Sequence, residues 1–583
     1  MDNKPSLSQY FSDTSVPPAS QFFDEIGTSP SDMIQSIYLG DSEGAQTTTA
    51  NLFPQNMDMV TGTSFSQQTT DEVTFSNVLP TVSGSTSVPA ASLPDPSTFF
   101  DTIGPEPQIG AIKSGIASPN ILTEAMDGLS VKNLPVDKEA DRRRDAWIPN
   151  DEAKKTLMKA QSSPKGSFFP EREVLTMPGI VLEEELQDAL QEVAVKYLGV
   201  SSAGARGVVR AEHVSRDEAG LRELLRTGYL RAAVNLTAVL LSAAQPVLLS
   251  AAQQGVGRMH RPSKHTPRTL QLWLTRFAVM LRVKILQPLV KEAEPFGDLN
   301  KPDMYYEFYP DIYEGRTGSL VPFSLRLLLA ELPSQVGKPE EALETLYAML
   351  RVIQQMLSNL REGKTEDGTG TLSSEQDKLE SIRLWTGRQT RVWHSVVNCA
   401  IAMKDYREAG KILTTLHSQA TSPGQRRALS SALGRLWLLA GHLPAASSRL
   451  RDASRDRHHL CPTPDVREYV DLGLLDIAQG KYQDAYNNFA RAADQEPTNI
   501  MVANNLSVCL LYMGRLKEAI AVLQKAINSD PERGLNESLL INLCTLYELE
   551  SSKTNEKKLN LLRMLCKFKS DTIPNVVECL KLS

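Results

Sequence analysis

Apolar residues recur at helical spacing along most of the chain beyond about residue 180, and near the C-terminus the pattern itself repeats every 34 residues. The repeating positions hold a glycine, a large apolar residue, an alanine, a second large apolar residue, a second alanine and a proline. They are Gly480, Tyr482, Ala485, Phe489, Ala492 and Pro497 in the first copy, and Gly514, Leu516, Ala519, Leu523, Ala526 and Pro531 in the second. Six matched positions in one register make coincidence a poor explanation.

This period is typical of the tetratricopeptide repeat, a helix–turn–helix unit. The glycine allows the turn between the helices, the alanines let the helices approach closely, and the proline ends the unit because it cannot continue a helix. One unit cannot bury its own apolar face and must stack on neighbours. We therefore expect an all-α fold with a tetratricopeptide-repeat solenoid over residues 321–533.

Earlier segments fit the same template with connections of varying length. We expect an N-terminal helical, repeat-like region at 171–320, and a C-terminal helical cap at 534–583 that closes the stack. Candidate units lie at about 214–247 (Gly228, Leu230, Ala233), about 323–356 (Gly337, Ala342, Leu346), about 390–423 (Tyr406, Ala409, Leu413) and from about Arg427 onward (Gly434, Gly441, Ala446, Leu450).

The N-terminal quarter has a different composition. Between Lys4 and Lys113 there is no lysine or arginine, while Ser, Thr, Pro and scattered acids abound. Such a segment has too little apolar content to offset the entropy of ordering, so we expect residues 1–140 to be disordered and 141–170 to be a partly ordered linker.

One aromatic pattern occurs twice in this quarter. Its copies are Phe22, Phe23, Asp24, Glu25, Ile26 and Gly27, and Phe99, Phe100, Asp101, Thr102, Ile103 and Gly104. Exposing paired aromatics is costly, so the duplication indicates partner-docking motifs that order on binding. The alternative is coincidence within a biased composition.

A basic segment follows, at Asp141–Pro149, in which three arginines stand between acids and precede Trp147. Three arginines could form a nuclear import signal, but the flanking acids favour a solvated helix end. We expect Trp147 to dock on the folded body.

Charge and cysteine usage narrow the function classes. The net charge of −7 gives no reason to expect nucleic-acid binding. The six cysteines lack a CxxC pair and several fall on predicted apolar helix faces, which indicates buried thiols in a reducing compartment. The N-terminus is polar and acidic, unlike a signal peptide. Polar residues and Pro246 interrupt the longest apolar stretch, so we expect no transmembrane segment.

Catalytic patterns are missing from the sequence. It contains neither a GxxxxGK phosphate loop nor a GxSxG nucleophile elbow. The run from His458 to Cys461 offers metal-ligand types, but no second cluster supplies further ligands, so a loop between repeats explains it better. We therefore expect no catalytic residue, no cofactor and no metal, and not an enzyme.

Some repeats of this kind grip acidic chaperone tails with basic and amide side chains on their inner helices. Here the corresponding positions include Val470, Leu474 and Met501, beside Asn504 and Asn505. An apolar groove cannot make the charge-assisted bonds that a carboxylate needs, which disfavours a co-chaperone function.

Several linear runs outside the repeat resemble one family, the helical-repeat subunits of the trafficking protein particle (TRAPP) tethering complex. The resemblance covers about 140–583. The runs are Asp141–Pro149, Leu270–Trp273, Glu294–Leu299, Tyr305–Pro310, Val321–Ser324, Ile382–Trp385, Val502–Asn505, Tyr547–Ser551 and Cys579–Leu582.

The resemblance implies a non-catalytic scaffold subunit in traffic from endoplasmic reticulum to Golgi, bound to other TRAPP subunits, especially large sister subunits. A Rab GTPase would be an indirect partner, activated by the assembled complex. It also implies a cytoplasmic protein that meets membranes peripherally, at the intermediate compartment or early Golgi. The alternative is an adaptor or assembly factor independent of vesicle traffic, with a chaperone-linked role or a mitotic, nuclear and kinetochore-linked role.

Overall fold

The computed structural model describes residues 138–582, except 164–174, 177, 183, 201–205, 245–264, 311, 373, 421–422, 459–462, 551–553, 572 and 574. Across these residues the chain is helical, and β pairing is confined to two isolated bridges, Tyr305 with Ser319 and Lys364 with Thr371. The all-α prediction is confirmed. The region expected to be disordered lies outside the described residues, apart from its last three residues, which begin α7.

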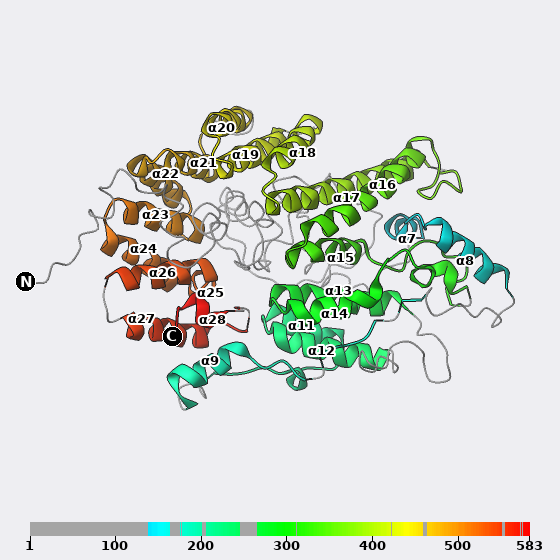
Figure 1. The fold of residues 1–583 in the computed structure, drawn as a ribbon, viewed down its shortest axis with the longest axis horizontal. Coiled ribbons are helices and arrows are strands. Elements are labelled where there is room, and N and C mark those ends of the chain that lie inside the picture. The colour runs from blue at the N-terminus through cyan, green and yellow to red at the C-terminus, as the bar shows by residue number, and fades with distance from the viewer. Residues whose placement is uncertain are drawn as a thin grey trace, which may run out of the picture. The chain divides into compact units, whose positions relative to one another are not determined.

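The described helices fall into two compact units. One unit holds residues 404–530, with α18 (Tyr406–Gln419), α19 (Pro423–Leu439), α20 (Leu443–His458), α21 (Val466–Ala478), α22 (Tyr482–Gln495), α23 (Ile500–Tyr512) and α24 (Leu516–Ser529) (Figure 1). We call it the repeat unit.

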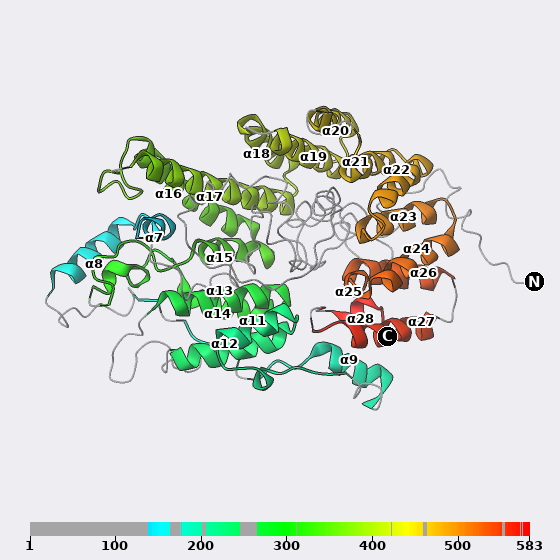
Figure 2. The same cartoon turned by 180° about the vertical axis from the view of Figure 1, so that it is seen from behind.

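The second unit joins residues 138–403 to 531–583. Its α-helices are α7 (Lys138–Asp145), α8 (Asp151–Ser162), α9 (Ala189–Leu198), α11 (Glu218–Arg226), α12 (Leu230–Ala244), α13 (Pro267–Arg282), α14 (Leu286–Ala293), α15 (Phe323–Gln335), α16 (Pro339–Arg361), α17 (Glu375–Ala402), α25 (Pro531–Gly534), α26 (Glu537–Glu550), α27 (Thr554–Phe568) and α28 (Val576–Cys579). Four 3₁₀ turns, η5 (Ala211–His213), η7 (Glu294–Phe296), η8 (Pro302–Met304) and η9 (Tyr306–Phe308), lie in its loops. We call it the flanking unit; Figure 2 shows the same elements from behind.

A residue in the left-handed conformation follows most of the helices that open a predicted unit. The φ angle is +77° at Gly228, +83° at Gly337, +72° at Gly441, +73° at Gly480 and +74° at Gly514. Glycine reaches this conformation without steric cost, whereas a residue with a β-carbon does not. The turn glycines chosen from the sequence therefore lie where the backbone requires them.

Two lysines adopt the same conformation after other helices. Lys284 follows α13 with a φ of +57°, and Lys404 follows α17 with a φ of +62°. Their sequence carries no glycine signal, and a β-carbon is strained there.

The flanking unit contains a fully buried ion pair that sequence patterns did not indicate. The Arg276 guanidinium on α13 donates to the Glu292 carboxylate on α14 at 2.6 and 2.8 Å, and both side chains are buried. Glu292 also accepts from the Val181 backbone N–H at 3.0 Å, and Arg276 donates to the Val234 carbonyl at 2.9 Å. Because a buried charge needs all its partners, this cluster fixes how α12, α13, α14 and the segment at 178–182 meet.

The C-terminal helices of the flanking unit pack against its early helices, since α27 and α28 both contact α9. The Asp571 carboxylate accepts from the backbone N–H groups of Leu230 at 2.6 Å and Arg231 at 2.9 Å, at the start of α12. Arg206 donates to Asp188 at 2.7 Å and to the Lys569 carbonyl at 2.5 Å. Residues more than 300 positions apart therefore satisfy one another's polar groups.

We expect Lys404→Gly to increase the free energy of unfolding by about 1 kcal/mol, because it relieves a left-handed residue that carries a β-carbon. Gly514→Ala should lower it by about 1–2 kcal/mol. A β-carbon at Gly514 would meet no atom within 4 Å, so that loss reports the backbone alone. Gly514→Asn, which tolerates this conformation better, is the control. Denaturant unfolding measures all three, and a destabilised Lys404→Gly protein would contradict the prediction.

Burial raises the pKa of Asp571 to about 6, above its usual value of 3.8. Between these two pH values the folded protein binds a proton that the unfolded chain does not, so this group's contribution to stability grows as pH falls through 6 and is lost as pH rises again. Asp571→Asn removes the titration. We expect the difference in melting temperature between wild type and Asp571→Asn to be larger at pH 5 than at pH 7.5, by about 2–4 °C for about 1 kcal/mol. A difference independent of pH would contradict this.

Candidate functional site

The 34-residue repeat forms the helix pairs α21–α22 and α23–α24 of the repeat unit. Of the residues chosen from the sequence, those that pack between helices are fully buried, namely Ala485, Phe489, Ala492, Ala519 and Leu523. Ala526 is half-buried, and the neighbouring Ile527 is buried in its place. Pro497 is exposed between α22 and α23, and Pro531 begins α25. Gly480 and Gly514 occupy the turns described above.

A close approach of α21 to α22 depends on a glycine that the sequence reasoning missed. A β-carbon on Gly473 would lie 2.7 Å from the Phe489 ring, closer than atoms can pack. At Gly434 a β-carbon would lie 2.3 Å from a methyl carbon of Leu450. Glycine at the eighth position of the first helix was the available signal, since Gly473 lies seven residues after Val466.

The positions expected to line an apolar groove belong instead to the interior. Val470, Leu474, Met501, Asn504 and Asn505 are all fully buried. Val470, Leu474 and Met501 join one core cluster of the repeat unit together with Phe489. These side chains therefore stabilise the stack and do not present a surface to a partner.

Polar side chains between α19 and α21 pair with one another. The Asp471 carboxylate accepts from the Ser431 hydroxyl at 2.7 Å and from Arg435 at 2.9 Å, and all three side chains are buried. Arg427 forms an ion pair with Asp465, whose pKa is lowered because Arg427 outweighs the cost of burial. A cavity of about 180 Å³ lies beside this cluster, lined in part by Leu472 and Leu475. Its charged groups are neutralised, so the cluster is a packing element.

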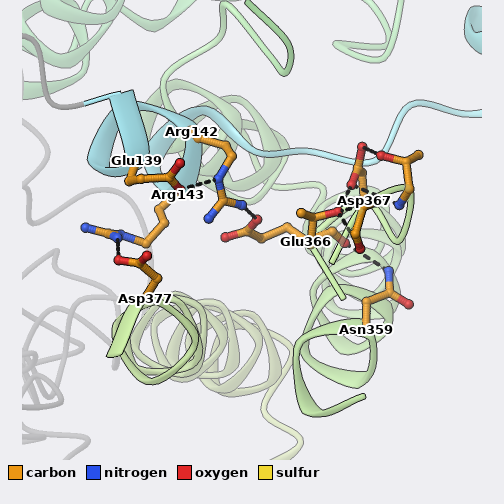
Figure 3. Close-up of polar contacts among 10 residues, drawn as sticks. Glu139, Arg142, Arg143, Asn359, Glu366, Asp367 and Asp377 are labelled. Carbon is orange, nitrogen blue, oxygen red and sulfur yellow. Dashed lines mark hydrogen bonds and ion pairs between the residues drawn. The ribbon is translucent and has the colours of Figure 1, made fainter. Parts of the chain in front are cut away.

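The arginine segment is anchored and not solvated, contrary to the prediction of a solvated helix end. Arg143 on α7 forms ion pairs with Asp377 at 3.1 Å and Glu380 at 2.8 Å, both on α17 (Figure 3). Arg142 binds Glu139 at 2.9 Å and pairs with the buried Glu366 in the loop between α16 and α17. Charges that the sequence places next to each other thus pair with distant acids.

The loop that receives Arg142 is held by its own polar groups. The Asp367 carboxylate accepts from the hydroxyls of Thr365 at 2.5 Å and Thr369 at 2.6 Å, which lowers its pKa against the opposing effect of burial. Asn359, near the end of α16, donates to the Glu366 carbonyl at 2.9 Å (Figure 3). The acceptor for Arg142 is therefore preformed by the loop.

Trp147 docks on the folded body, as predicted, and is 5% exposed. Its ring nitrogen donates to Asn300 at 2.8 Å. The Arg326 guanidinium lies 4.5 Å from its ring centroid, and the Trp385 ring lies 6.2 Å away. Aromatic and cation–π contacts of this kind add to the burial of the large ring.

Both aromatic docking motifs, Phe22–Gly27 and Phe99–Gly104, lie outside the described residues, and so does Cys461. Among the described cysteines, Cys399, Cys509, Cys544 and Cys579 are buried and Cys566 is half-buried. Within the described ranges no three metal-ligating side chains gather, and no helix has both the length and the apolar composition to cross a bilayer.

Comparison with known proteins gives two kinds of match. Residues 476–536 match the tetratricopeptide repeat family, which confirms the repeat inferred from the 34-residue period. The chain is also 36% identical over 446 residues to the Mus musculus protein named trafficking protein particle complex subunit 12, covering 76% of this chain and 54% of that protein. Identity to the Homo sapiens protein of the same name is 36% over 447 residues, covering 76% and 59%. The chain thus spans little more than half the length of these relatives.

We expect Arg143→Gln to loosen α7, because it removes two ion pairs from a side chain that is only 12% exposed. Amide hydrogen exchange across residues 138–148 should accelerate about threefold to tenfold, corresponding to about 1 kcal/mol. Arg144→Gln is the matched control, since Arg144 is 51% exposed and pairs with Asp141 and Asp145 of its own helix. Equal exchange in the two variants would show that the ion pairs with α17 do not hold α7.

Proposed function

The chain is a relative of trafficking protein particle complex subunit 12 over 76% of its length, and from this premise we propose that it is a non-catalytic scaffold subunit of the TRAPP tethering complex. The observation that carries the proposal is the 36% identity over 446 residues. This alignment is far longer than the 61 residues, 476–536, that match the tetratricopeptide repeat family. A shared repeat alone would not align most of the chain, including its non-repeat segments.

In this proposal the protein acts in early secretory traffic, between endoplasmic reticulum and Golgi. Its helices contact other TRAPP subunits, especially large sister subunits, and the assembled complex activates a Rab GTPase through other subunits. The protein is cytoplasmic and reaches the intermediate compartment or early Golgi as part of the complex, which associates with membranes peripherally.

The chemistry of the described residues supports a scaffold over an enzyme. Burial raises the pKa of Cys399, Cys509 and Cys544 to about 12, so these thiols are protonated and poorly nucleophilic at neutral pH. Buried charges such as Arg276 and Glu292 are used in packing. Helical repeats of this type usually bind other proteins through their stacked surfaces.

The test is affinity purification of the tagged full chain from its own cells, followed by gel filtration and mass spectrometry. We expect the chain to elute as part of a large assembly with TRAPP subunits in constant ratio. A second chain that begins at Lys138, where α7 starts, should retrieve the same subunits, because the proposal assigns assembly to the helical part. An adaptor independent of vesicle traffic would elute mostly alone or with chaperone or kinetochore proteins, and that outcome would overturn the proposal.

A further inference from the structure

An aromatic cleft lies between α16 and α17 in the flanking unit. It has a volume of about 550 Å³ and is lined by Glu344, Tyr347, Leu350, Arg351, Gln354 and Trp393. The residues from α16 are three or four positions apart and so share one face of that helix. Tyr347 is 38% exposed, and its ring meets the half-buried Trp393 edge-on, with 6.1 Å between centroids. Clefts of this size are large enough for side chains of a ligand.

One charge in the cleft is available to a ligand. Arg351 is exposed and forms no ion pair with any residue that the structure describes. Most other cations near this surface are paired, as Arg143 is with Asp377 and Glu380. Two aromatic rings beside an unpaired guanidinium suit a ligand that presents aromatic side chains followed by a carboxylate, because rings stack on rings and a carboxylate forms charge-assisted hydrogen bonds with arginine.

This chain contains such a ligand in Phe99–Gly104, where two phenylalanines precede Asp101. We propose that this segment binds the cleft between α16 and α17 of its own chain. Phe99 and Phe100 then cover the rings of Tyr347 and Trp393, and Asp101 pairs with Arg351. The proposal does not depend on the scaffold function.

The point at which the chain enters the fold supports this occupant. Residue 138 begins α7, which is ion-paired to the start of α17 through Arg143. The 33 residues from 105 to 137 can extend up to about 110 Å. The path along α17 from Asp377 to Trp393 is about 24 Å, at 1.5 Å per residue. The segment can therefore reach the cleft with ample length to spare.

The tether also distinguishes the two copies of the motif. Phe22–Gly27 has the same chemistry but is separated from α7 by 110 residues. The effective concentration of a tethered ligand falls with linker length, by about sixfold between linkers of 33 and 110 residues. Phe99–Gly104 is therefore the favoured occupant.

The experiment uses the full chain and a fluorescein-labelled peptide of residues 96–107, with binding followed by fluorescence polarisation. In Phe99→Ala/Phe100→Ala protein the cleft is vacated and should bind the peptide. Wild type should bind at least about tenfold more weakly, because its own segment competes at high effective concentration. Adding Arg351→Glu to the double variant should abolish binding, and a peptide with Asp101→Arg should restore it. Arg361→Glu makes the same change of charge on α16 outside the cleft and should have no effect.

Each other outcome overturns the proposal. Equal binding to wild type and to the double variant would mean that the segment does not occupy the cleft. Undiminished binding after Arg351→Glu would place the peptide elsewhere, and no binding to the double variant would remove the ligand altogether. If the peptide binds only after Phe22→Ala and Phe23→Ala are added, the occupant is the first motif and not Phe99–Gly104.

Discussion

The tight turn between paired helices is the constraint on which the rest of this fold depends. At Gly480 and Gly514 the chain adopts the left-handed conformation. The residue that follows each glycine then donates to a carbonyl five positions earlier, from Lys481 to Asp476 at 2.9 Å and from Arg515 to Leu510 at 2.8 Å. This geometry satisfies the end of the first helix and sets the direction in which the second one leaves. Only then can the apolar faces of the two helices meet.

Small residues convert that direction into contact. Gly473 lets the ring of Phe489 lie against α21, and the side chain of Leu450 takes the space beside Gly434 in the same way. The resulting core of the repeat unit is continuous from Leu438 to Cys509, so its helices stabilise one another. A stack of this kind gains stability from each neighbouring pair. It leaves the polar helix faces available for partners.

Irregular segments are held by a different means, through charges and polar groups on distant helices. Glu292 binds the backbone at 181, Asp571 binds the start of α12, and Arg143 binds α17. These contacts use carboxylates and guanidinium groups because such groups form the stronger hydrogen bonds. They bring the beginning and the end of the described chain into one compact unit. For a scaffold, this arrangement fixes the ends of the helical array without requiring a long apolar interface.

The sequence by itself determined the helical class, the 34-residue repeat, its turn glycines and the docking of Trp147. These features follow from local geometry and spacing, which depend on neighbours within one or two helical turns. Tertiary structure alone decided the rest. It buried Val470 and Leu474, which the repeat pattern had suggested for a groove, and it paired Arg142 and Arg143 with Glu366, Asp377 and Glu380. It also placed Asp571 beside Leu230, more than 300 residues away. Periodicity gives the face on which a residue lies, but only folding determines which distant group it meets there.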